Sequence, residues 1–219
     1  MKNKLEFVLP SEEIDFETGS SVEIEVESGD SFCWDGLNLN DVEFNLFNAS
    51  FGKSSRIKIV DTVVNGDLFI HGAGVDLEVV EIINCEISGK IVLENIRAGK
   101  IRIVGRANFL DFRKVDFGDI YICGEFKAGI IMDSLNGIEI EVNGYSSDVF
   151  LNDLKLAKVK FLNFHSDLIE GWGLDIGEAS IPTGNKINFG GVTFNYLNLL
   201  DGNKKTGSIY HLRDAYLRI

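Results

Sequence analysis

A pattern of the form apolar-x-apolar recurs about every ten residues along this chain, and it constrains the fold more than any other feature. Typical copies are Ile57-Lys58-Ile59, Leu68-Phe69-Ile70, Ile101-Arg102-Ile103 and Ile120-Tyr121-Ile122. Successive side chains of a strand point to opposite faces, so the outer two residues of each triplet face one way and the middle residue faces the other. Asn-Gly pairs, which favour tight turns, follow several triplets. The pattern therefore predicts an all-β chain of short repeated strands, as in a solenoid.

Two architectures place a turn about every eight to twelve residues: an antiparallel sandwich or barrel, and a parallel β-helix. A second spacing separates them. Phe32, Leu37, Val42 and Phe47 lie five residues apart, and the spacing returns at 187–197. Antiparallel hairpins have no reason to keep this spacing, whereas a four-sided coil spends five residues on each side. The sequence therefore favours a parallel β-helix, with a wider three-sided coil as the alternative for its middle.

The five-residue units resemble the repeat of the pentapeptide-repeat family, in which a small or apolar residue is followed by Asp or Asn and then by Leu or Phe. The best matches are Ile187-Asn188-Phe189, Val192-Thr193-Phe194, Leu197-Asn198-Leu199, Leu37-Asn38-Leu39, Val42-Glu43-Phe44, Ala107-Asn108-Phe109 and Val115-Asp116-Phe117. The resemblance covers stretches within residues 32 to 200, and Val, Ile or Leu often stands where the family has Ala. It implies a right-handed parallel β-helix.

The pattern changes at both ends of the chain. Residues 1–31 are expected to form an N-terminal β cap with an acidic outer surface, because Val22, Ile24 and Val26 alternate with Glu23, Glu25 and Glu27. Residues 32–200 are expected to form the solenoid, about eight coils stacked at about 4.8 Å, with a loop insertion near 164–186 where the repeat is lost. In residues 201–219 the apolar positions follow helical spacing, which predicts a capping helix or the start of a longer helical region.

Composition narrows the class of protein. The 219 residues are 45% apolar and carry a net charge of −13, with no run of eighteen apolar residues and no cleavable apolar leader. We therefore expect a cytoplasmic chain without a membrane span. Cys33, Cys85 and Cys123 are scattered and lack the spacing of metal ligands or of a disulfide framework, so we expect buried free thiols, no metal and no cofactor.

Two regions are candidates for binding. The span from Arg97 to Lys114 holds six basic residues and one acidic residue in an otherwise acidic chain, which suggests contact with an acidic partner. The candidate residues in this span are Arg102, Arg106, Arg113 and Lys114. In the expected loop, His165 and Trp172 could line a ligand groove with an aromatic platform.

Three functions are consistent with this sequence. The first is a non-enzymatic scaffold that binds a protein partner or itself. The second follows from the resemblance, because some pentapeptide-repeat proteins mimic DNA and inhibit a topoisomerase. The third is a carbohydrate-active enzyme that uses Asp111, Asp116 and Asp119 as acid and base. We rank the scaffold first, and we expect no direct contact with nucleic acid because the overall negative field opposes phosphate.

Overall fold

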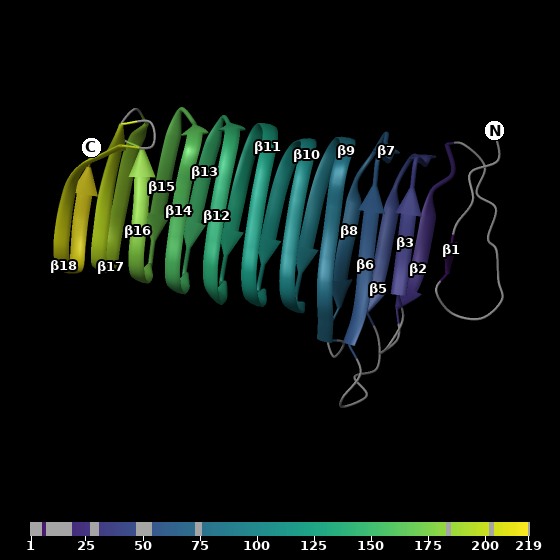
Figure 1. Ribbon diagram of the computed structural model, residues 1–219, viewed down its shortest axis with the longest axis horizontal. Coiled ribbons are helices and arrows are strands. Elements are labelled where there is room, and N and C mark those ends of the chain that lie inside the picture. The colour runs from purple at the N-terminus through teal and green to yellow at the C-terminus, as the bar shows by residue number, and fades with distance from the viewer. Residues whose placement is uncertain are drawn as a thin grey trace.

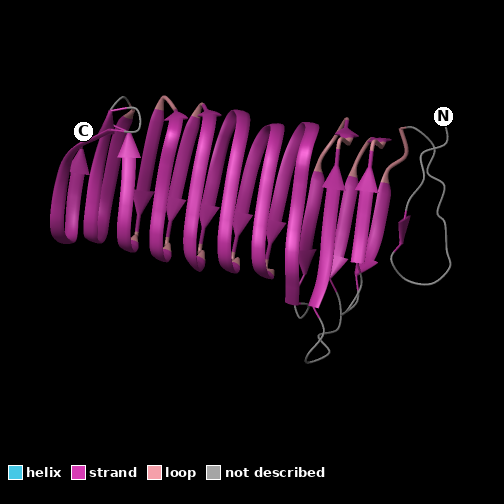
Figure 2. Ribbon diagram, viewed as in Figure 1, coloured by secondary structure: helices cyan, strands magenta, loops and turns pink. Residues whose placement is uncertain are grey.

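The chain forms a rod of stacked β-coils (Figure 1). The computed structural model describes residues 6–7, 19–26, 31–46, 54–72, 76–182, 185–201 and 204–218. Every regular element in these ranges is a β-strand, and short loops join the strands at the corners (Figure 2). The stack has about eight turns. The prediction of an all-β parallel solenoid is therefore confirmed.

The strands lengthen towards the middle of the rod, where one continuous strand follows most of a coil. The first nine are β1 (Glu6–Phe7), β2 (Val22–Val26), β3 (Ser31–Asp35), β4 (Asn38–Leu39), β5 (Val42–Leu46), β6 (Ser54–Val60), β7 (Val63–Val64), β8 (Leu68–Gly72) and β9 (Asp76–Glu94). The others are β10 (Arg97–Arg113), β11 (Asp116–Asp133), β12 (Asn136–Ser146), β13 (Asp148–Asn152), β14 (Lys155–His165), β15 (Leu168–Trp172), β16 (Asp175–Pro182), β17 (Lys186–Asp201) and β18 (Lys204–Arg218).

Each coil lies in parallel register on the next. Asp116 pairs with Asn136, and Asn136 pairs with Lys155, so a coil takes about twenty residues. Within β11 we name three faces: face 1 runs through residues 116–123, face 2 through 125–126 and face 3 through 130–133. The same names apply to the residues stacked on them in other coils. Backbone hydrogen bonds between coils thus run along the whole rod.

The alternation predicted for the triplets sets the core. Ile120 and Ile122 are 2% and 0% exposed, while Tyr121 between them reaches the surface. Each such aliphatic side chain contributes about 1.5–3 kcal/mol on burial, before the cost of ordering the chain is subtracted. The largest fully buried side chains include Trp34, Phe44, Phe112, Phe126, Phe161, Phe189 and Phe194. One continuous core therefore runs the length of the stack.

A column of glycines forms the corner between faces 1 and 2. Gly105, Gly124 and Gly144 stack on one another in three consecutive coils. A Cβ atom on Gly124 would lie 1.9 Å from the carbonyl oxygen of Gly105, and one on Gly144 would lie 2.1 Å from that of Gly124. The backbones approach too closely at this corner for any side chain.

The prediction of a C-terminal helix in 201–219 is wrong, because residues 204–218 form the strand β18. This strand runs antiparallel to β17 and is the last layer of the rod. The positive φ angles of His211 and Asp214, 55° and 44°, bend the strand. Each bend shifts the alternation of side chains by one residue, so inward positions recur at intervals of three and imitate helical spacing.

Two further expectations are corrected. A separate N-terminal β cap in residues 1–31 is not supported, because β2 lies in parallel register with β5 as a layer of the solenoid. Apart from β1, β2, residues 19–21 and Ser31, this segment lies outside the described residues. The expected loop near 164–186 is instead largely strand, since β15 and β16 continue the stack. The five-residue spacing fails there; the alternation of buried and less buried residues persists in β15 but not in β16, whose last four residues are all buried.

Candidate functional site

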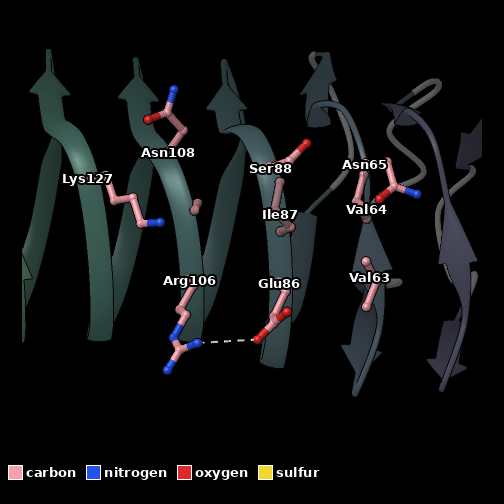
Figure 3. A pocket seen from close by; sticks show the side chains of 10 residues that line it. Val63, Val64, Asn65, Glu86, Ile87, Ser88, Arg106, Asn108 and Lys127 are labelled. Atoms are coloured by element: carbon pink, nitrogen blue, oxygen red, sulfur yellow. Dashed lines mark hydrogen bonds and ion pairs between the residues drawn. The ribbon is translucent and has the colours of Figure 1, made fainter.

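Face 2 carries a groove that crosses four coils (Figure 3). The inward residues Val64, Ile87 and Ala107 pair with one another across consecutive coils and form its base. The exposed residues that directly follow these three positions, together with the residue after the buried Phe126 of the next coil, form a row along the rod. This row consists of Asn65, Ser88, Asn108 and Lys127. The groove has a volume of about 410 Å³ and is lined by amide, hydroxyl and ammonium groups.

A second row, on the other side of the groove base, carries alternating charge. Glu86 pairs with Arg106 in strand register, and Arg106 pairs with Glu125. The guanidinium of Arg106 lies 3.5 Å from the Glu86 carboxylate and 3.8 Å from that of Glu125, and its side chain is 67% exposed (Figure 3). Exposed ion pairs of this length contribute little stability. Arg106 can therefore exchange these partners for the carboxylate of a ligand.

The amide row has internal support at one end. The Nδ2 group of Asn65 donates to Oδ1 of Asn38, 2.9 Å away, and to the carbonyl oxygen of Leu39, 3.3 Å away. These bonds fix the orientation of the Asn65 amide before any ligand arrives. The groove is thus partly preorganised, which lowers the entropy cost of binding.

The four basic candidate residues are distributed around the coil. Arg102 lies on face 1, with its guanidinium carbon 5.7 Å from the centre of the Tyr121 ring. Arg106 lies on face 2 and Arg113 on face 3. Lys114 occupies the corner that follows, with a φ angle of 53°. The structure therefore brings only Arg106 to the groove, and the role of all four in binding stays a prediction.

Arg113 is engaged by its own strand. Its Nε and one terminal nitrogen donate to the two oxygens of Asp111, at 2.9 and 2.6 Å. These hydrogen bonds raise the pKa of the guanidinium. Asp111 is only 4% exposed although it points away from the core, because it lies between Val92 and Ile131 of the adjacent coils. The ion pair of Asp111 and Arg113 is therefore a structural feature of face 3.

The carboxylates weighed as catalytic groups lie on two faces. Asp111 belongs to face 3 and is held by Arg113, whereas Asp116 and Asp119 belong to face 1. The corner at Lys114 separates Asp111 from the other two. Asp116 accepts a hydrogen bond from the Asn136 side chain, 3.3 Å away.

His165 and Trp172 lie on strands, in different environments. His165 ends β14 and stacks on Tyr145, with ring centres 6.0 Å apart. Trp172 ends β15 and covers Gly190, where a Cβ atom would lie 2.1 Å from the indole. Its other neighbour is Tyr216, at 6.2 Å between ring centres. The two candidates therefore do not share one groove, and Trp172 belongs to the C-terminal end of the rod.

The titratable groups of the described residues give little indication of a metal site or a catalytic site. Within the described ranges, no group of three His, Cys, Asp or Glu side chains could hold a metal ion. Cys85 is buried, and this burial raises the pKa of its thiol. On face 1, partial burial and a hydrogen bond to Cys123 raise the pKa of Tyr121. These shifts follow from packing, and the groups concerned do not converge on the groove.

Sequence reasoning missed most of the groove because its lining residues come from different coils. Asn65, Ser88, Asn108 and Lys127 are separated by about twenty residues each. The signal that could have found them is the register itself, since writing the sequence in lines of one coil places these residues in one column.

Comparison of this chain with known protein families, with curated proteins and with solved structures gave no match. The resemblance to pentapeptide repeats therefore has no support from a family match, and the parallel β-solenoid is the level at which the fold is defined. In the described part of the chain, no helix has the length and apolarity needed to cross a bilayer.

Proposed function

We propose that this chain is a non-enzymatic scaffold that binds a protein partner in the groove on face 2. The observation that carries the proposal is the row of exposed polar side chains, one from each of four consecutive coils, beside the partly free charge of Arg106. Parallel coils repeat at about 4.8 Å. An extended segment laid along the rod would meet a new polar side chain at every coil, in fixed geometry.

The charges of the groove define the chemistry of the partner. Asn108 offers an amide donor for a backbone carbonyl oxygen, and Asn65, whose Nδ2 already donates to Asn38 and Leu39, offers its Oδ1 to a backbone N–H. Lys127 and Arg106 offer cations for carboxylates. The lining holds two cations, Arg106 and Lys127, against the single carboxylate of Glu86, in a chain whose net charge is −13. The proposed partner is therefore an extended, acidic protein segment that binds in the groove through hydrogen bonds.

The alternatives have less support. DNA mimicry needs rows of like negative charge, yet the outward row on face 1 runs Lys58, Glu81, Arg102 in neighbouring coils, with Lys58 3.8 Å from Glu81. Of the three carboxylates weighed for a carbohydrate-active site, Asp111 is held by Arg113 on face 3, and of the two on face 1 Asp116 is bonded to the Asn136 side chain. We therefore place the scaffold first.

The test uses two variants with the same change of charge. Lys127→Glu reverses a charge in the groove, and Lys100→Glu reverses one on face 1, where the side chain is also exposed. Each purified chain is immobilised and incubated with a lysate of its own cells, and the captured proteins are quantified by mass spectrometry.

The proposal predicts a partner that the native chain and Lys100→Glu both retain and that Lys127→Glu loses by about tenfold or more, since reversing an interfacial charge adds repulsion. Thermal unfolding of the three chains controls for folding. Capture that is unchanged in Lys127→Glu, or that falls equally in Lys100→Glu, would contradict the groove as the binding site.

A further inference from the structure

The C-terminal end of the rod presents an open strand edge. One edge of β18 pairs with β17, and no strand of the described residues pairs with its other edge. Figure 1 shows β18 as the last layer at one end of the stack, with β2 near the opposite end. A fifteen-residue edge of this kind offers unpaired backbone groups to another chain.

The inner side chains of β18 are incompletely covered. Ile209, Leu212 and Leu217 pack against the core but are only partly buried. In the preceding layer, Ile187 and Phe194 are each 1% exposed. One further layer on β18 would give its inner residues the same cover, and the burial of apolar area would stabilise that association.

Charge indicates which surface supplies that layer. The strand β18 carries four basic residues and one acidic residue. Its basic residues are Lys204, Lys205, Arg213 and Arg218. The first thirty residues of the chain carry nine acidic and two basic side chains. Two β18 strands would bring like charges together, whereas a β18 strand and the β2 strand of a second copy, which carries Glu23 and Glu25 and no basic residue, are complementary.

At the N-terminal end β1 pairs antiparallel with β3, and the edge that the described strands leave available is that of β2. Among the described residues, β2 has a single strand neighbour, β5. Its Glu23 is exposed and lies on the same face of the rod as Arg218 of β18. Both residues belong to face 3, which is formed by the stacked strands β2, β5, β8, β17 and the end of β18. A second copy stacked in line would thus place Glu23 and Arg218 on one continuous face.

Exposed aromatic rings flank the open edge. Tyr210 is 55% exposed and lies with its ring centre 4.5 Å from that of Tyr196, while Tyr216 is 79% exposed beside Trp172. Aromatic residues are enriched in protein interfaces. These two pairs lie on different faces, so they border the end of the rod on both sides.

We propose that copies of this chain associate head to tail, with the β18 edge of one copy against the β2 end of the next. The contact joins two different surfaces, so each added copy leaves a free β18 edge, and linear assemblies result unless the rotation closes a ring. The groove on face 2 lies along the side of the rod and stays open in such an assembly. The inference goes beyond the proposed function and does not depend on it.

Charge-reversal variants test the polarity of the contact. The tail variant is Lys204→Glu, Lys205→Glu, Arg213→Glu and Arg218→Glu. The head variant is Glu23→Lys, Glu25→Lys and Glu27→Lys. A third chain combines both sets. Sedimentation velocity of each purified chain is measured over a range of concentrations at low and high salt, and circular dichroism checks that each variant is folded.

Head-to-tail contact predicts that the native chain associates at low salt and dissociates at high salt, because the attraction between its ends is screened. The head and tail variants should each weaken association by about tenfold or more, and the combined variant should recover it. A head variant that associates like the native chain would overturn the polarity. A native chain that stays monomeric at all concentrations, or a folded combined variant that does, would overturn the proposal.

Discussion

Replacement of Gly124 by Ala should strongly destabilise the solenoid, because the backbones of neighbouring coils approach closely at this glycine. The new Cβ would lie 1.9 Å from the carbonyl oxygen of Gly105, while ordinary contact requires at least 3.4 Å. The two coils would have to separate locally by about 1.5 Å from a spacing of about 4.8 Å, which breaks their hydrogen bonds. Overpacking of this kind costs about 1–3 kcal/mol, and occasionally more, so we expect about 3 kcal/mol or more at this site.

The effect is measured by urea unfolding followed by circular dichroism and by thermal unfolding. For a chain of this size each kcal/mol lowers Tm by about 2–4 °C, so Gly124→Ala should lower Tm by about 6–12 °C. The matched control is Gly207→Ala in β18, where the added Cβ would meet only a Leu199 methyl group at 3.9 Å. We expect this control to stay within about 0.5 kcal/mol of the native chain. A Gly124→Ala chain as stable as the control would refute the close approach of the coils.

Two further predictions concern buried titratable groups. Burial raises the pKa of the Cys85 thiol above 9.0, so the unfolded chain loses this proton first and stability should fall as pH rises beyond about 9. Urea unfolding at pH 7 to 10 should show a shallower fall of stability with pH in Cys85→Ala than in the native chain. Equal slopes would contradict a raised pKa at Cys85. At face 3, Arg113→Ala leaves the Asp111 carboxylate unpaired and should cost about 2 kcal/mol, whereas Asp111→Ala leaves an exposed guanidinium and should cost about 1 kcal/mol or less. Urea unfolding of both variants checks this order, and the reverse order would show that Asp111 is not the buried member.

The architecture of the middle of the rod could be predicted because burial there follows simple alternation. In Ile120-Tyr121-Ile122 the outer residues are buried and the middle one is not, as the triplet indicates. The recurrence of such triplets without helical spacing was enough to indicate an all-β chain of short repeated strands, and the five-residue spacing then favoured the parallel arrangement. The five-residue spacing was a weaker guide, because Gly118 interrupts the alternation between Phe117 and Ile120 and changes the spacing within the coil.

The C-terminal strand could not be predicted from the same alternation. Inward residues Ile209 and Leu212 lie three apart because His211 adopts a left-handed backbone conformation between them. The next inward position is Ala215, after a second such residue at Asp214. A non-glycine residue with positive φ is uncommon, and although His and Asp adopt it more often than most residues, their presence alone does not mark a bend. A bent strand therefore showed the spacing of a helix.

The candidate site shows the same limit at a larger scale. The run from Arg97 to Lys114 is compact in sequence, but it spans most of one coil and is carried around the rod, so Arg102 and Arg113 end on different faces. The groove residues are instead scattered in sequence and close together in the structure. Asn65 and Lys127 are far apart in sequence and belong to the same column of stacked positions. In a solenoid, neighbours on the surface are separated by one coil, and the register has to be known before they can be named.

The parallel register is the central claim, and a disulfide between neighbouring coils tests it most directly. In a chain whose three native cysteines are replaced by Ser, Lys100→Cys and Asp119→Cys place two thiols at paired positions on face 1. Paired positions in adjacent strands lie about 4.8 Å apart, within the range that a disulfide spans. The control combines Lys100→Cys with Glu139→Cys, two coils apart and about 10 Å away. Mild oxidation followed by mass spectrometry should show an intramolecular disulfide in the first chain and free thiols in the second. Equal oxidation of both chains, or a disulfide only in the control, would contradict the stacked coils on which the groove and the open end both depend.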